Sequence, residues 1–137
     1  MKPTAILLAT AAFMVLALTT SAFADDVPHT SYSTVARTPV PDARPVMLAA
    51  IHATDGEAHG LLTGDVADAI TRRFGATSPI FIDVTTERRY QQPGCSRLKV
   101  LFWQEGVLLP SATAPRKQTM EFGINYCLDG LPPKSLQ

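Results

Sequence analysis

Alternating apolar and polar side chains mark three β-strands in the C-terminal half of the chain. Every second residue is Ile, Val, Leu, Phe, Met or Tyr in three segments, residues 80–85, 97–103 and 120–127. A period of two is typical of strands that bury one face. Residues 107–109 are a candidate for a short returning strand. The pattern predicts a small, mainly antiparallel sheet of three to five strands.

Helical spacing is clearest in residues 66–74, where apolar residues recur three or four positions apart: Val66, Ala69, Ile70 and Phe74. Thr63 is the expected N-cap of this helix. A second apolar run, residues 45–53, fits either a buried strand or the start of a helix. We expect the helix over 66–74 to cover the apolar face of the sheet. The predicted fold class is therefore α+β, with one helix packed on the sheet in two layers.

The first 24 residues have the three parts of a secretion signal. Met1–Lys2 is a positive start, residues 5–18 are almost wholly apolar, and residues 22–24 (Ala-Phe-Ala) form a small-x-small cleavage site. The apolar run of about 14 residues is shorter than the roughly 20 that a membrane-spanning helix needs; an uncleaved anchor is the alternative. We expect cleavage after Ala24, no membrane span afterwards, and export to the periplasm of a Gram-negative cell.

Cleavage would leave residues 25–137, a length of 113 residues that suits one domain. Residues 25–45 contain four prolines and few large apolar side chains, which predicts a flexible, Pro-rich leader. This leader is either an unimportant tail or a tether or docking strand for a partner, and composition does not separate the two. Residues 46–137 then form a single α+β domain.

Both cysteines, Cys95 and Cys127, lie in the exported part. In an oxidising compartment two cysteines most simply form one disulfide. Residues two apart share a face of a strand, and both cysteines fall on the more polar face of the second and third predicted strands. If those strands are antiparallel neighbours without a bulge, the cysteines meet at one edge of the sheet. We therefore predict a Cys95–Cys127 disulfide; free thiols or a bond to another molecule are the alternatives.

The charge balance gives no electrostatic reason to expect nucleic acid as a direct partner. The chain has 12 basic and 12 acidic residues, and without Lys2 the exported part has a formal charge near −1. Nucleic-acid binding depends on neutralising several phosphates, and no block of like charge indicates a membrane-surface patch.

Four residues with metal-ligating side chains are close in the sequence: His52, Asp55, Glu57 and His59. Zinc accepts imidazole nitrogen and carboxylate oxygen as ligands. Their spacing matches no established metal-binding signature, and a glycine interrupts them. They are weak candidates for a metal site, and we expect no bound metal or other cofactor.

No recognisable catalytic motif is present: the chain lacks a G-x-S-x-G elbow and a C-x-x-C pair. We assign no catalytic residue and expect a protein that is not an enzyme. The candidate site is a partner-binding patch made of Trp103, Leu101, Lys99 and Tyr90. Trp103 shares the polar face of its strand with Leu101 and Lys99, and an exposed Trp beside Leu is typical of such patches. Alternatively, a second layer formed by residues 45–53 or the leader covers Trp103.

Three phrases in the second half of the chain carry a resemblance to a known family: PIFIDVTTERRY, QPGCSRLKV and QTMEFGINYCLDGLPP. Over residues 59–136 the chain resembles small exported proteins that accompany bacterial conjugation systems, the type IV secretion machineries. The resemblance implies a periplasmic accessory or structural role in DNA transfer between cells, through contacts with envelope proteins. It brings no active site and no functional residues.

Three hypotheses follow. The leading one is a periplasmic accessory protein of a conjugative apparatus that acts by protein–protein contacts. The second is a small periplasmic hydrolase acting on the cell wall, which predicts a cleft with a carboxylate or histidine in an unusual environment. The third is an inhibitor or immunity-type protein that inserts the loop 110–118 into a partner's active site.

Overall fold

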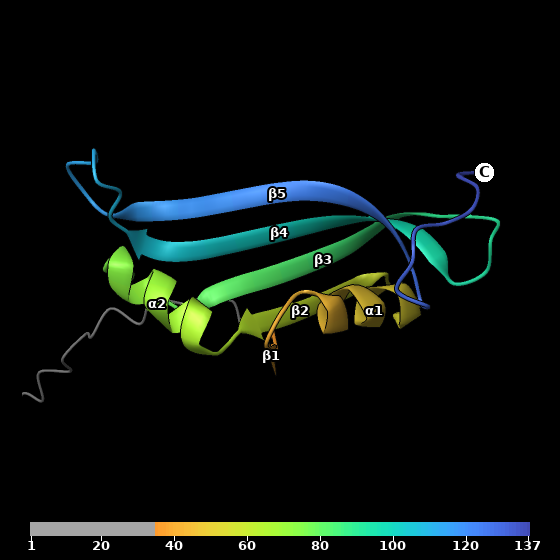
Figure 1. The fold of residues 1–137 in the computed structure, drawn as a ribbon, viewed down its shortest axis with the longest axis horizontal. Coiled ribbons are helices and arrows are strands. Elements are labelled where there is room, and N and C mark those ends of the chain that lie inside the picture. The colour runs from red at the N-terminus through yellow and green to blue at the C-terminus, as the bar shows by residue number, and fades with distance from the viewer. Residues whose placement is uncertain (1–34) are drawn as a thin grey trace, which may run out of the picture. The chain divides into compact units, whose positions relative to one another are not determined.

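The computed structural model describes residues 35–137. The predicted signal segment and residues 25–34 of the leader lie outside the described residues. The described part forms a five-stranded sheet whose spatial order follows the sequence (Figure 1). The strands are β1 (Thr38–Val40), β2 (Glu57–Leu62), β3 (Ile80–Arg89), β4 (Cys95–Val107) and β5 (Arg116–Cys127). The β1–β2 pair is parallel and the other neighbouring pairs are antiparallel.

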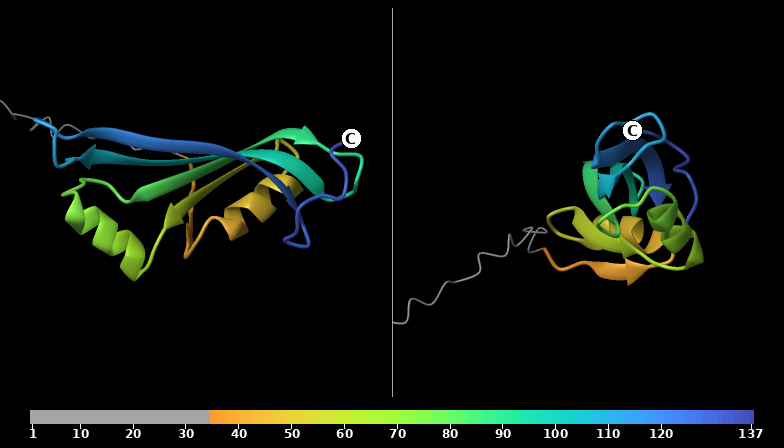
Figure 2. Two further views of the ribbon diagram at one scale, coloured as in Figure 1. Left: turned by 45° about the horizontal axis from the view of Figure 1, so that its top comes forward. Right: turned by 90° about the vertical axis from the view of Figure 1, so that its left-hand side faces the viewer.

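Two helices lie on one face of this sheet, toward opposite ends of it (Figures 1 and 2). They are α1 (Arg44–His52) and α2 (Asp65–Arg73). The expected combination of helix and mainly antiparallel sheet is confirmed, although strands dominate over helix. The expectation of a single covering helix is wrong, because the run that fitted either a strand or a helix forms α1.

The core lies between α1 and the sheet. Ile82, Leu98 and Val100 are fully buried on the sheet, at the alternating positions that the sequence pattern singles out. The residues that α1 buries against them recur at helical spacing: Val46, Met47, Ala50 and Ile51. Gly60 in β2 permits this close approach, because a Cβ at that position would press on the Val46 side chain.

The ordered fold begins before residue 46. The C-terminal end of the predicted flexible leader, residues 25–45, is therefore part of the folded domain. Residues 38–40 form β1, and the helix α1 starts at Arg44. The Asp42 carboxylate accepts a hydrogen bond of 2.8 Å from the Arg44 backbone N–H, and Pro45 occupies the first turn of α1, where its missing N–H costs nothing. The prolines at this end therefore help to start a helix.

Two further predictions are wrong: Thr63 as the N-cap of the helix over 66–74, and a separate strand at residues 107–109. The residue before α2 is Gly64, with φ 103°, and no side chain caps the helix; Thr63 instead donates its hydroxyl to the Val40 carbonyl at 3.2 Å. At the other site, β4 continues to Val107, so residues 107–109 make no separate strand. A register shift at Gln104–Val107 sets Glu105 and Gly106 (φ 67°) against one residue of β5, which is a β-bulge.

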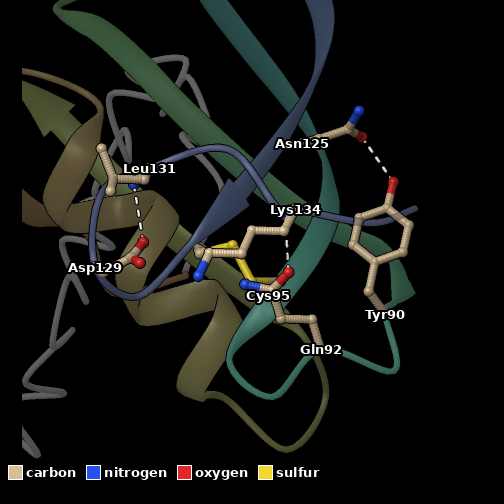
Figure 3. The surroundings of a disulfide bond; sticks show 8 residues. Tyr90, Gln92, Cys95, Asn125, Asp129, Leu131 and Lys134 are labelled. Carbon is tan, nitrogen blue, oxygen red and sulfur yellow. Dashed lines mark hydrogen bonds between the residues drawn. A yellow bond between two sulfur atoms is a disulfide. The ribbon is translucent and has the colours of Figure 1, made fainter. Parts of the chain in front are cut away.

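The predicted disulfide between Cys95 and Cys127 is confirmed. The two cysteines are directly opposite each other in the β4–β5 register, which runs without a shift from this pair to Gln104–Gln118. Figure 3 shows the chain after β5 returning past the β3–β4 hairpin, where the Lys134 backbone N–H donates to Gln92 Oε1 at 2.8 Å. The disulfide therefore joins the start of one long strand to the end of the next.

Replacing both Cys95 and Cys127 by Ser should lower the free energy of unfolding by about 3–4 kcal/mol, because the cross-link closes a loop of 32 residues in the unfolded chain. Urea unfolding of the variant beside the oxidised protein measures the loss. A thiol titration of the denatured, unreduced protein should find no free thiol, and two titratable thiols would contradict the pairing.

Candidate functional site

The four weak metal-ligand candidates are not brought together. His52 ends α1, which covers one face of the sheet, whereas Glu57 and His59 lie in β2 at positions that face the other side. Asp55 lies in the turn between them, where its carboxylate accepts the Glu57 N–H. Among residues 35–137, no three His, Cys, Asp or Glu side chains are close enough to hold a metal ion.

His59 instead joins a polar cluster centred on Asp83 in β3, on the sheet face opposite the helices. Asp83 lies directly across from His59 in the β2–β3 register, and their Oδ1 and Nδ1 atoms are 2.7 Å apart. Arg37 Nη1 donates to the same Oδ1 at 2.8 Å, and Trp103 Nε1 donates to Oδ2 at 2.6 Å. Sequence reasoning missed this cluster, because the three partners of Asp83 lie 20 to 46 positions from it in the sequence.

The environment of Asp83 keeps its carboxylate ionised. Partial burial alone would raise its pKa, but the hydrogen bonds from Arg37, His59 and Trp103 outweigh that effect, so the pKa is lowered from its ordinary value. Because an ionised carboxylate only accepts hydrogen bonds, the His59 Nδ1–H is the donor in their contact. Both oxygens of Asp83 are thus engaged, and the cluster ties residues before β1 to β2, β3 and β4.

No nucleophile completes this cluster in the described part of the chain. His59 makes its side-chain hydrogen bond to Asp83 alone. Both cysteines of the chain, Cys95 and Cys127, are joined in the disulfide. The hydrogen bonds of this cluster therefore hold Arg37, β2, β3 and β4 together.

Trp103 is 9% exposed, so it is not the open anchor that the patch interpretation required. Its ring lies 4.3 Å from the Phe81 ring centroid to centroid. Arg37, from the predicted leader, lies 5.3 Å from the Trp103 ring centroid, and Lys117 lies 4.0 Å from it. The alternative interpretation, in which the leader covers Trp103, describes the structure better.

The other patch residues are divided between two places. Lys99 and Leu101 are half-buried on the same face as Trp103. Tyr90 lies at the disulfide end, where its hydroxyl donates to Asn125 Oδ1 at 2.7 Å (Figure 3) and Arg88 lies over its ring. The four residues form no continuous apolar surface.

An apolar groove opens on the helix-bearing face, between α2 and β5. Its volume is about 310 Å³. Its apolar lining comes from both helix and sheet: Leu62, Ile70, Ile80, Phe102, Trp103 and Met120. We expected the helix over 66–74 to cover the Phe122 side of this face, but Met120 is 60% exposed and Phe122 41% exposed. The helix that forms the core with the sheet is α1, and it leaves this end open.

The composition of α2 explains the opening. Ala67 is its one buried residue, and Val66 is 73% exposed. The helix carries two acidic and two basic residues, and it is held to β4 largely by polar contacts such as the hydrogen bond from Gln104 to Thr71. An excess of apolar positions on the sheet over apolar positions on α2 is the signal that could have indicated the groove.

Comparisons with protein-family models, curated proteins and solved structures found no match for this chain. Within residues 35–137, neither helix has the length and apolar character that crossing a membrane requires.

Replacing Asp83 by Asn should lower the free energy of unfolding at neutral pH by about 1–3 kcal/mol, because charge-assisted hydrogen bonds are lost and Arg37 loses its partner. A carboxylate with a lowered folded-state pKa stabilises above the ordinary Asp value, and this stabilisation is lost as the pH falls through the lowered pKa. The difference in free energy of unfolding between the wild type and the variant should therefore become smaller below about pH 4. Urea unfolding at a series of pH values measures it.

Asp42→Asn is the matched control. Asp42 pairs with Arg44 at 2.7 Å, but this pair is exposed to water, which weakens it. The control should cost much less stability than Asp83→Asn at neutral pH. Equal losses would contradict the structural role of the Asp83 cluster.

Proposed function

We propose that this chain is an exported accessory protein that acts by binding an envelope protein, as part of a conjugative, type IV secretion apparatus. The observation that carries the binding role is the apolar groove between α2 and β5. An open groove with an apolar lining is a typical place for contact with a partner. Burying the exposed parts of Met120 and Phe122 would contribute on the order of 1 kcal/mol each.

The chemistry of the groove favours binding over hydrolysis at this place. The groove is lined by apolar side chains and by the uncharged side chains of Gln104, Gln118 and Thr119. The ionised Asp83 and its partner His59 lie on the opposite face and hydrogen-bond to each other. A hydrolase would need a titratable group and a substrate cleft in the same place. The groove beside α2 lacks that combination, which occurs in a separate cavity of about 330 Å³ that Glu57 and His59 line.

The place of action rests on the sequence. The secretion signal directs the chain to the periplasm, and a disulfide suits that oxidising compartment. The resemblance of residues 59–136 to exported proteins of conjugation systems supports the assignment to a transfer apparatus. This assignment makes the partner another envelope protein of that machine.

Deleting the gene from a donor cell should lower the frequency of conjugative transfer, and the wild-type gene supplied in trans should restore it. Ile70→Asp should restore it poorly, because it places a charge in the groove. Val66→Asp, one turn earlier on the same helix and already exposed, should restore it fully. Transfer frequency is measured by mating, with the periplasmic level of each variant measured in parallel.

Unchanged transfer after deletion would exclude the role in conjugation. Equal complementation by the two α2 variants would exclude the groove as the binding surface.

A further inference from the structure

The outer edge of β5 is long and open. β5 has 12 residues, contains no proline and carries no bulge of its own, since the extra residue near Gln104 lies in β4. Residues 35–137 provide no strand partner for its outer side, which forms one border of the sheet (Figure 1). Long, regular edge strands are templates for pairing with another strand, and proteins usually shorten, bend or cover them.

The disulfide pair shows which backbone groups of β5 point outward. The Cys127 N–H donates to the Leu131 carbonyl, and the Cys95 N–H donates to the Gln92 carbonyl. Cys95 and Cys127 are thus a pair without mutual backbone hydrogen bonds. Hydrogen-bonded and non-hydrogen-bonded pairs alternate along an antiparallel ladder. The N–H and C=O groups of Thr119, Glu121 and the other odd-numbered residues of β5 therefore point away from β4.

The open part of this edge is its N-terminal two thirds. All residues from 116 to 123 except Gln118 are exposed, whereas residues 124–126 are half-buried. Near the disulfide the chain turns back, and the Leu131 carbonyl already occupies the outward N–H of Cys127. A strand that pairs with β5 would therefore centre near residue 119.

We propose that β5 pairs antiparallel with β5 of a second copy, about a two-fold axis at Thr119, so that two sheets join into one. In this register Lys117 lies opposite Glu121 of the second copy, and the reciprocal pair repeats the contact. Thr119 lies opposite Thr119 of the second copy. Opposite charges and paired threonines are favourable cross-strand neighbours. The same patch serves both copies, as a two-fold interface requires.

The charges of the edge select this register. Lys117 and Glu121 lie on the same face, and Glu121 forms no ion pair with any residue of the described part. Lys117 is 49% exposed and 3.6 Å from Glu105, so its ammonium group remains accessible to a second carboxylate. Sliding one copy by two residues would centre the axis on Met120 and set Lys117 opposite Gly123, so the direct charge pairs would be lost. Sliding it by four residues would centre the axis on Glu121 and set two like charges opposite each other. Pro115 ends the ladder, because it has no N–H to donate.

Pairing at Thr119 would also join the two apolar grooves. Met120 faces the helix-bearing side, lines the groove and is 60% exposed. Across the axis it is a diagonal neighbour of Met120 of the second copy, within reach of a long side chain. The two grooves would then form one trough that crosses the axis.

The test uses the protein exported with its own signal and purified from the cell envelope, studied by sedimentation equilibrium over a range of concentrations. The wild type should show a monomer–dimer equilibrium. Lys117→Glu and Glu121→Lys should each raise the dimer dissociation constant about tenfold or more, because each replaces two attractive pairs by two repulsive ones. The double charge-swap variant should restore wild-type affinity.

Lys99→Glu is the matched control, because Lys99 lies on the same face but within β4, away from the edge; it should leave the dissociation constant unchanged. Thr119→Pro is a second test, because Lys117→Glu could also disturb the contact between residue 117 and the Trp103 ring. It removes an outward N–H and leaves the hydrogen bonds to β4 intact, so it should give a folded monomer. Circular dichroism checks the fold of each variant.

A wild type that is monomeric at all concentrations would overturn the proposal. So would a dimer that ignores both charge reversals or is not rescued by the swap. Because these measurements use pure protein, their failure is independent of the outcome of the mating experiments.

Discussion

The alignment of Cys95 with Cys127 across β4 and β5 is the constraint on which the rest of the structure depends. A shift of one residue in this pairing would turn every side chain of β5 to the other face of the sheet. The disulfide excludes such a shift at the end where the strands are joined. It thereby keeps Met120 and Phe122 on the same face as Phe102, which is the face that carries the helices.

The two helices use this ordered face unequally. α1 places four buried apolar residues on the sheet and forms the core with it. α2 buries one alanine and relies on polar contacts. The fold is thus well packed beneath α1 and open beside α2, and the candidate binding surface is the part of the sheet that α2 does not cover. The stable core and the open groove both follow from the different numbers of apolar residues that α1 and α2 bury on the sheet.

Local pattern predicted the three long strands, the helix α2 and the disulfide, because each depends on period, parity or composition. It missed β1 and β2, since β1 has three residues and the β2 sequence EAHGLL shows no alternation. The Asp83 cluster depends on the pairing of β2 with β3 and of β3 with β4, which a single sequence does not reveal. The exposure of Met120 depends on how far α2 reaches across the sheet. The burial of Trp103 was missed because Arg37, which lies over its ring, belongs to the segment that composition predicts to be a flexible leader.

The position of β1 determines how the domain would respond to mechanical load. A pull on the N-terminal side acts first on a pairing of three residues and on the contact between Arg37 and Asp83. The β4–β5 hairpin lies at the other border of the sheet and is covalently closed. Weakly held elements open before the rest of a domain. Tension would therefore detach β1 and withdraw Arg37 from the Asp83 carboxylate and the Trp103 ring, while the cross-linked hairpin kept its shape.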